Sequence, residues 1–389
     1  MTTLLSADYI VPVTQPPVKN GVLEITGDGT IVAVHSPDSR ALARREVYRH
    51  RGIIVPGFVN AHCHLELSHM LGVIPKHTGL VPFLLAVMRS RIAAEDTVSQ
   101  AMEAADEQMA ANGIVAVGDH ANNSLSATIK HRSSLHYHTF VETIGVEPEL
   151  AAEKLRLSRA TAETFDARRV SITAHAPYSV SGTLFALLDG AREVPVPLSI
   201  HNQESAAEND FFRDKSGVFL DFYHALGKDI SGFASGAETA LRAYVPYLGE
   251  QTPLLLVHNT FSVAGDIRFA AAAGREVTWC LCPNANLYIE GTLPHVPDFI
   301  RHDQRIALGT DSLASNGQLC ILSELRTLHE HFPELPFTET IKWATINGAL
   351  ALRLADRYGS FEKGKRPGIN LLMHTDGLAI TPETTVHPL

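Results

Sequence analysis

From about residue 53 to residue 359, short hydrophobic runs alternate with longer amphipathic stretches. Each run ends in polar residues, which is typical of a parallel strand buried between helices. The alternation predicts an α/β fold in which eight parallel strands close into a (β/α)8 barrel. The predicted strands are Ile53–His62, Gly113–Asp119, His136–Glu142, Val170–His175, Pro197–His201, Pro253–His258, Glu276–Cys282 and Arg305–Asp311.

The two ends of the chain carry a different pattern. Residues 1–53 contain strand-like runs with turn signals at Asn20-Gly21 and Asp28-Gly29, and residues 360–389 are also extended in pattern. These runs lie outside the eight predicted barrel strands. They predict a small β-sandwich domain built from both chain ends, beside a TIM-barrel domain of residues 54–359.

Composition narrows the class of protein. Apolar residues make up 45% and charged residues 19% of the chain, so it can bury a large core. The formal net charge of −10 disfavours nucleic acids and anionic membranes as partners. The sequence shows no secretory signal and no run of apolar residues long enough to span a membrane. We therefore expect a cytoplasmic enzyme with reduced cysteines.

Histidine is unusually frequent, with 20 residues, and several lie at the ends of predicted strands. One histidine at a strand end is usually a core or surface residue, so a single position says little. In a barrel, however, the carboxyl ends of all strands meet at one face. Imidazoles and a carboxylate that converge there suit zinc, with iron and manganese as alternatives. The residues concerned are His62, His64, His175, His201, His258 and Asp311.

Glu204 is a candidate for proton transfer beside the metal ion. It follows His201 by three residues, just beyond a predicted strand end. A carboxylate beside a metal ion can take a proton from water and give one to a leaving amine. The alternative is that Glu204 lies exposed in the first turn of the next helix.

Ordered motifs then reveal a resemblance. The chain resembles the amidohydrolase superfamily over nearly its whole length, within the cytosine-deaminase-like and chlorohydrolase-like branch. The strand-seven motif departs from the family pattern, because Ala285 stands where serine is common. The matching strings are PGFVNAHCHLELS (56–68), AHAPYSVS (174–181), HNQE (201–204), VHNT (257–260), CPNAN (282–286) and LGTDSLASN (308–316).

This resemblance implies a role for each matching residue. It implies that the metal ligands are His62, His64, His201 and Asp311. It implies that His258 orients the attacking water, that Glu204 shuttles protons, and that Asp311 also helps to remove the proton of the water. Two-metal branches carry a carboxylated lysine at the end of strand four, whereas this chain has His175 there and no lysine nearby. We therefore expect one divalent ion, zinc by preference.

The expected partner is a small heterocyclic substrate, and we predict that Glu66, Ser68, His175 and Asn286 contact it. The strings HLELS and LGTDSLASN are similar to those of deaminases that act on 6-aminofutalosine, an adenine nucleoside derivative. Deaminases of S-adenosylhomocysteine or methylthioadenosine, of guanine or cytosine, and triazine chlorohydrolases remain alternatives. A scaffold protein without catalysis is a further alternative, although the retained ligand residues argue against it. Relatives are commonly homo-oligomers, but no surface feature predicts an interface.

Overall fold

The computed structural model describes residues 2–192, 197–233, 235–272 and 274–389. Its centre consists of two four-stranded parallel sheets with strand orders β11-β10-β9-β8 and β12-β13-β14-β15. All eight predicted strands are therefore present, which confirms a mixed α/β fold with parallel sheets. Their bounds are β8 (Phe58–Cys63), β9 (Ile114–Ala121), β10 (His136–Thr143), β11 (Val170–Ala174), β12 (Leu198–Asn202), β13 (Leu254–His258), β14 (Val277–Leu281) and β15 (Arg305–Leu308).

Hydrogen bonds and bridges join the two sheets at both edges. At one edge, the backbone N–H of His201 donates to the carbonyl of His175 at 2.9 Å. At the other edge, Cys63 and Asp311 form a parallel β-bridge. The carboxyl ends of the strands in both sheets therefore face one shared region.

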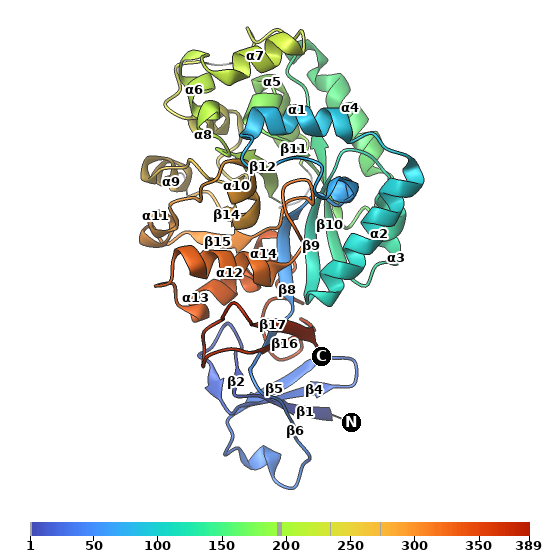
Figure 1. Ribbon diagram of the computed structural model, residues 1–389, viewed down its shortest axis with the longest axis vertical. Helices are drawn as coiled ribbons and strands as arrows, with labels where there is room; N and C mark the ends of the chain where they lie inside the picture. The colour runs from blue at the N-terminus through green and yellow to red at the C-terminus, as the bar shows by residue number, and fades with distance from the viewer. Residues whose placement is uncertain (1, 193–196, 234, 273) are drawn as a thin grey trace.

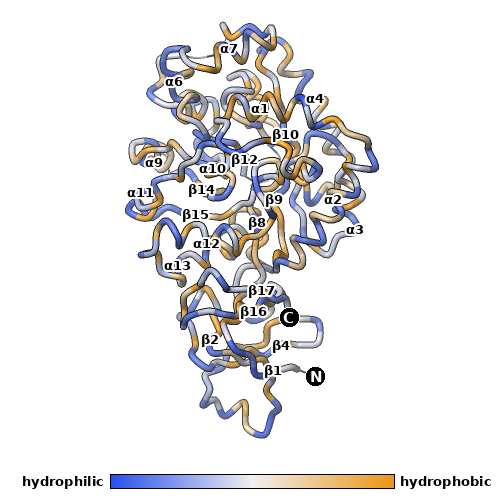
Figure 2. The backbone as a smooth tube through the Cα atoms, in the orientation of Figure 1, coloured by the Kyte–Doolittle hydropathy of each residue, from blue (hydrophilic) through white to orange (hydrophobic). Residues whose placement is uncertain are grey.

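Helices cover the outside of the sheets (Figure 1). The interior is hydrophobic, and Figure 2 shows apolar stretches along β8 and β9 in the middle of the molecule. Among the described residues, no helix combines the length and apolar character needed to cross a membrane. The helices are α1 (Leu80–Ser90), α2 (Glu95–Ala111), α3 (Ala127–Arg132), α4 (Ala151–Ala162), α5 (Gly182–Gly190), α6 (Ala206–Asp214), α7 (Val218–Ala225), α8 (Ala240–Tyr244), α9 (Ala264–Ala271), α10 (Pro283–Ile289), α11 (Val296–Arg301), α12 (Ile321–His331), α13 (Phe337–Trp343) and α14 (Ile346–Ala351).

The two ends of the chain pair with each other at the bottom of Figure 1. One sheet has the order β5-β4-β1-β6 and the other has the order β17-β16-β7-β2-β3. One hydrophobic cluster contains residues from both sheets, including Leu5, Leu23, Ile54 and Leu371. The strands are β1 (Thr2–Ser6), β2 (Tyr9–Ile10), β3 (Val18–Lys19), β4 (Val22–Thr26), β5 (Ile31–His35), β6 (Tyr48–Arg49), β7 (Ile53–Pro56), β16 (Ile369–Met373) and β17 (Thr385–Pro388).

One predicted strand needs correction. Ile53–His62 was expected to be a single barrel strand. Its first part is instead β7, which pairs with β2 and β16 in the five-stranded sheet formed by the two chain ends. The chain passes between the two sheets at Gly57. A Cβ atom there would lie 2.3 Å from Val115 Cγ1 and 2.7 Å from the carbonyl oxygen of Pro367. Only glycine permits so close an approach, and the hydrophobic pattern does not reveal it.

Candidate metal and active site

A cavity of about 350 Å³ opens at the carboxyl ends of the central strands. Its volume lies in the range of small-molecule sites. Its floor is polar and includes His64, His201, Glu204, His258 and Asp311. Its walls are mostly apolar and come largely from α1 and α7. The cavity therefore has polar, titratable side chains at its base and mostly apolar side chains around them.

The predicted metal ligands meet at this floor. Nε2 of His64 lies 3.1 Å from Nε2 of His201. Oδ1 of Asp311 lies 3.4 Å from Nε2 of His62 and 3.5 Å from Nε2 of His64. Four ligand atoms bound tetrahedrally at zinc distances would be about 3.3 Å apart. These three distances are therefore compatible with one tetrahedral ion.

Hydrogen bonding sets which nitrogen of His201 faces the other ligands. Nδ1 of His201 lies 2.8 Å from the carbonyl oxygen of His175, which can only accept a hydrogen bond. Nδ1 must carry the proton, so Nε2 of the neutral ring presents its lone pair to His64. A backbone carbonyl that fixes a ring in this way is a usual support for a metal-ligating histidine.

His62 is the clearest sign that a cation belongs here. Its side chain is fully buried, and neither ring nitrogen has a hydrogen-bond partner. Burial, and next the His120 ring, lower the pKa of His62 well below its usual value. Burial, followed by His175, does the same to His201. Both rings are therefore held neutral, the form that binds metal.

Asp311 supplies the negative charge of the site. Burial opposes ionisation of Asp311, but the nearby ring of His62, followed by the other rings of the site, outweighs burial and holds the pKa of Asp311 well below its usual value. The Ser315 hydroxyl donates to Oδ2 of Asp311. The backbone φ of Asp311 is +55°, a left-handed conformation that is uncommon for a residue other than glycine. This sharp turn follows β15 and carries the carboxylate to the floor of the cavity.

Glu204 and His258 lie beside the ligands. Nε2 of His258 is 3.7 Å from Oε1 of Glu204, and Nδ1 of His258 is 2.9 Å from Oδ1 of Asn286. Burial, and next the negative charge of Asp311, raise the pKa of Glu204 well above its usual value. Glu204 is therefore a buried carboxyl group on the cavity floor, not an exposed helix residue. A group of this kind can hold a proton and pass it on.

Of the four predicted substrate contacts, only His175 belongs to the described lining of the cavity. The carboxylate of Glu66 accepts hydrogen bonds from the backbone N–H groups of Asn122 and Asn123. The Ser68 hydroxyl donates to the carbonyl of Leu65. Asn286 contacts His258, as described above. These three side chains bind protein atoms, so any contact of theirs with substrate stays a prediction.

Two functional candidates were not identified from the sequence. His120 lies near the ligands, with its ring centroid 4.5 Å from that of His62. Both of its nitrogens have partners, because Nδ1 is 2.8 Å from Glu142 and Nε2 is 2.8 Å from Ser199. The predicted second strand stopped at Asp119, two residues before the end of β9, and so did not include His120. The position of Glu142 at the end of the third predicted strand was a usable signal.

Several groups of side chains in the described residues are close enough to hold an ion. One group comprises His62, His201, His258 and Asp311, so His258 could also be a ligand. A second comprises His62, His64, His120 and His201, but both ring nitrogens of His120 already have partners. Another combines Glu142, His175 and His201. In that group the nitrogen of His201 nearest Glu142 is Nδ1, which already donates to the carbonyl of His175. The geometry therefore favours one ion beside His62 rather than a second one beside Glu142.

Comparisons with known proteins agree with this geometry. An adenosine deaminase of Helicobacter pylori is 26% identical over 82% of this chain and 78% of its own length. An aminodeoxyfutalosine deaminase of Deinococcus radiodurans is 27% identical over 84% of this chain and 80% of its own length. The crystal structure of Helicobacter pylori aminofutalosine deaminase superposes with a TM-score of 0.81 at 22% identity, covering 97% of this chain and 93% of that one, and so shares the fold. The amidohydrolase family model matches residues 53–384, and the protein therefore belongs to the amidohydrolase family.

Proposed function

We propose that this protein is a metal-dependent hydrolase that deaminates an adenine nucleoside derivative, of the 6-aminofutalosine or the S-adenosylhomocysteine and methylthioadenosine type. The observation that carries the proposal is the convergence of three imidazoles and one carboxylate beside Glu204. The names of the similar deaminases support the substrate class. The cavity volume of about 350 Å³ is suitable for a nucleoside.

The proposal includes a finer description of the fold. The two parallel sheets form one closed (β/α)8 barrel, because contacts join them at both edges. The two end sheets pack as a β-sandwich around their common hydrophobic cluster. The domain boundary lies at Gly57 rather than at residue 53, because β7 pairs within the end sheet. This arrangement places the active site on the barrel face formed by the carboxyl ends of the strands.

In this proposal His62, His64, His201 and Asp311 hold one divalent ion, with zinc preferred for its tetrahedral imidazole and carboxylate ligation. When bound, such an ion supplies Lewis acidity that makes water a nucleophile near neutral pH. The orphaned ring nitrogens of buried His62 support this ligand set. Iron and manganese remain alternatives because they accept the same ligand types.

The side chains of the protein then move the protons. Asp311 takes one proton of the attacking water as its oxygen bonds to the ring carbon that bears the amine, and Glu204, which burial keeps protonated, gives its proton to the ring nitrogen that receives the C=N π electrons. The ionised Glu204 then takes the remaining hydroxyl proton and gives it to the amine nitrogen, so the carbonyl forms, the C–N bond breaks and ammonia leaves. His258 has its Nδ1 fixed by Asn286, so Nε2 faces Glu204 and can orient the water. His175, on the cavity wall, is placed to contact the substrate ring.

The variant Glu204→Gln tests this mechanism. We expect kcat for ammonia release from adenine nucleosides to fall about 100- to 10,000-fold, the usual contribution of a general acid–base group. Metal analysis should show unchanged zinc content, because Glu204 is not a proposed ligand. Asp210→Asn is the matched control, since Asp210 is an exposed acidic residue of α6 paired with Arg213, and it should keep wild-type activity.

Three outcomes would contradict the proposal. Equal activity of wild type and Glu204→Gln would remove Glu204 from the reaction. Chloride release from a chlorotriazine, without ammonia from adenosine, methylthioadenosine, guanine or cytosine, would favour the chlorohydrolase alternative. Absence of bound metal after purification with added zinc would favour the scaffold alternative.

A further inference from the structure

One cation on the cavity wall has no role in the chemistry described so far. Arg91 follows α1 directly, is half-buried and lines the cavity. We propose that Arg91 makes the site selective for a nucleoside that carries an anionic group, such as a carboxylate, on an apolar substituent. This inference rests on the proposed function and specifies the part of the substrate that does not react.

The bonding of Arg91 leaves most of its donors free. A guanidinium carries five N–H donors, and the only hydrogen bond of this side chain within the described structure runs to Oδ1 of Asn122 at 3.0 Å. No carboxylate of the described residues lies within ion-pair distance of it. Its position suits a bidentate contact with a carboxylate, the geometry that guanidinium favours.

The other charges of the cavity wall do not neutralise Arg91. Glu142 also lines the cavity, but its Oε1 pairs with His120 at 2.8 Å and its Oε2 accepts from Asn122 at 2.7 Å. Glu147 is paired with Lys228 at 2.6 Å. Lys154 also lines the cavity and adds a further positive charge. The wall outside the metal site therefore carries an excess of positive charge.

Neighbouring residues hold Arg91 in place before any ligand binds. The side chain of Asn122 donates to Glu142, and its backbone N–H donates to Glu66 at 3.0 Å. Glu66 thereby helps to fix the loop that presents Asn122. Groups fixed in advance lose less entropy on binding, so the contact gains affinity and selectivity.

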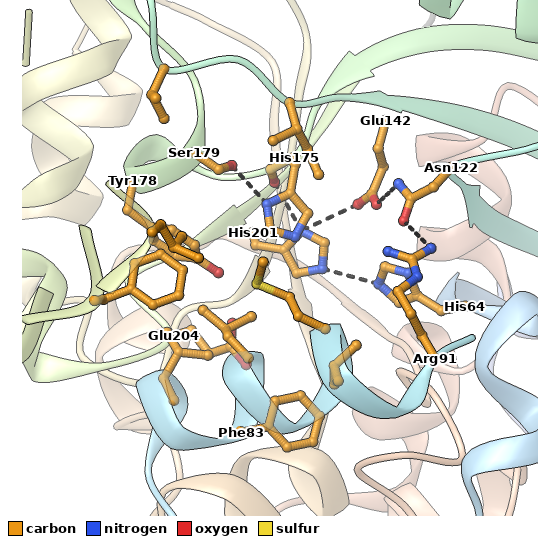
Figure 3. A pocket seen from close by; sticks show the side chains of 18 of the residues that line it. His64, Phe83, Arg91, Asn122, Glu142, His175, Tyr178, Ser179, His201 and Glu204 are labelled. Atoms are coloured by element: carbon orange, nitrogen blue, oxygen red, sulfur yellow. Dashed lines mark hydrogen bonds and ion pairs between the residues drawn. The ribbon is translucent and has the colours of Figure 1, made fainter. Parts of the chain in front are cut away.

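The walls also indicate what connects the reacting ring to the anion. In the view of Figure 3, Glu204 lies at the left of the site, whereas Arg91 lies at the right, where it overlaps His64. Apolar side chains of α1, of α7 and of the residue after α7 line the same cavity, namely Leu80, Phe83, Leu84, Val87, Met88, Phe222 and Leu226. A ring held near Glu204 would extend along these side chains, so its substituent should be apolar before it reaches the guanidinium.

Matched substrates and variants test the inference. The substrates are adenosine 5′-thioethers with short or long alkyl chains that end in a carboxylate or in the neutral carboxamide. For the better chain length, zinc-loaded wild type should favour the carboxylate in kcat/KM by about 10- to 100-fold, the range of a charge-assisted hydrogen-bond pair. In Arg91→Met this ratio should fall to about one, and Arg91→Lys should keep part of it. Arg89→Met, which changes an exposed arginine of the same helix, should leave the ratio unchanged.

A binding measurement separates this inference from the proposed function. Calorimetry with the corresponding inosine compounds reports affinity without turnover. Carboxylate preference that disappears in Arg91→Met supports the inference even if no adenine nucleoside is deaminated, which would refute only the proposed function. Deamination of both substrate series with a carboxylate ratio near one in wild type, or the same ratio in wild type and Arg91→Met, would overturn the role of Arg91 alone.

Discussion

Two buried polar clusters lie at neighbouring strand ends and differ in how their atoms are partnered. The ligand cluster comprises His62, His64, His201 and Asp311. The paired cluster comprises Asp119, Lys130, His120 and Glu142. In the paired cluster, Nζ of Lys130 lies 2.5 Å from Asp119 and His120 lies 2.8 Å from Glu142. In the ligand cluster, the ring nitrogens of His62 have no hydrogen-bond partner.

We therefore expect the paired cluster to stabilise the fold and the ligand cluster to serve the function. Buried polar groups normally satisfy one another, so the paired cluster is complete without a ligand. A buried group without a partner costs free energy, and such a cost persists where a ligand offsets it. The ligand cluster should therefore respond to added metal, whereas the paired cluster should respond only to changes in its own residues.

The largest expected effect is that of Asp311→Asn. The amide keeps the volume of the side chain but removes the negative charge that the ion requires. We expect loss of bound zinc and a fall of kcat/KM to below about one-thousandth of wild type. Zinc should raise the unfolding free energy of wild type by about 4 kcal/mol at a free concentration of about 1,000 times Kd, and should add nothing to Asp311→Asn. Thermal unfolding with and without zinc measures this, and equal gains for both proteins would refute the ligand assignment.

A smaller effect, confined to stability, should follow from Lys130→Met. Asp119 is fully buried, so the variant leaves its charge without a cation and should cost about 3–5 kcal/mol of unfolding free energy. Zinc should still stabilise the folded variant as it stabilises wild type. The matched control is Lys342→Met, which breaks an exposed pair with Glu339 and should cost less than about 1 kcal/mol. A stable Lys130→Met protein that no longer binds zinc would show that the two clusters are not distinct.

Much of the fold and of the ligand cluster is predictable from sequence for a physical reason. Buried parallel strands produce hydrophobic runs, and a barrel brings their carboxyl ends together. The positions of His62, His201 and Asp311 after such runs therefore predict their convergence. The split at Gly57 is not predictable this way, because the runs on both sides of it are equally hydrophobic and the cause is a close approach to Val115.

Buried polar residues outside the ligand cluster show where the position of a residue at a strand end is not enough to predict its role. Glu66, like the ligands, is a polar residue next to a strand end, yet its oxygens bind Asn122 and Asn123. Lys130 lies within α3 and meets Asp119 only because that helix folds back onto β9 and β10. Whether a buried polar group is paired depends on residues distant in sequence. Strand-end position therefore predicts burial at the site but not which groups remain free for a ligand.

The smallest effect should come from Ser199→Ala, at the junction of the two clusters. Ser199 is fully buried and its hydroxyl partners Nε2 of His120, so the variant should lose about 1–2 kcal/mol of unfolding free energy. His120 packs against His62, so a small shift of its ring should also lower kcat a few-fold while zinc stays bound. Ser171→Ala is the matched control, because Ser171 forms the same type of contact with His138 at 2.9 Å. It should lose less stability, because Ser171 is only half-buried, and should keep wild-type kcat. An equal loss of kcat in both variants would show that His120 has no special influence on the ligand cluster.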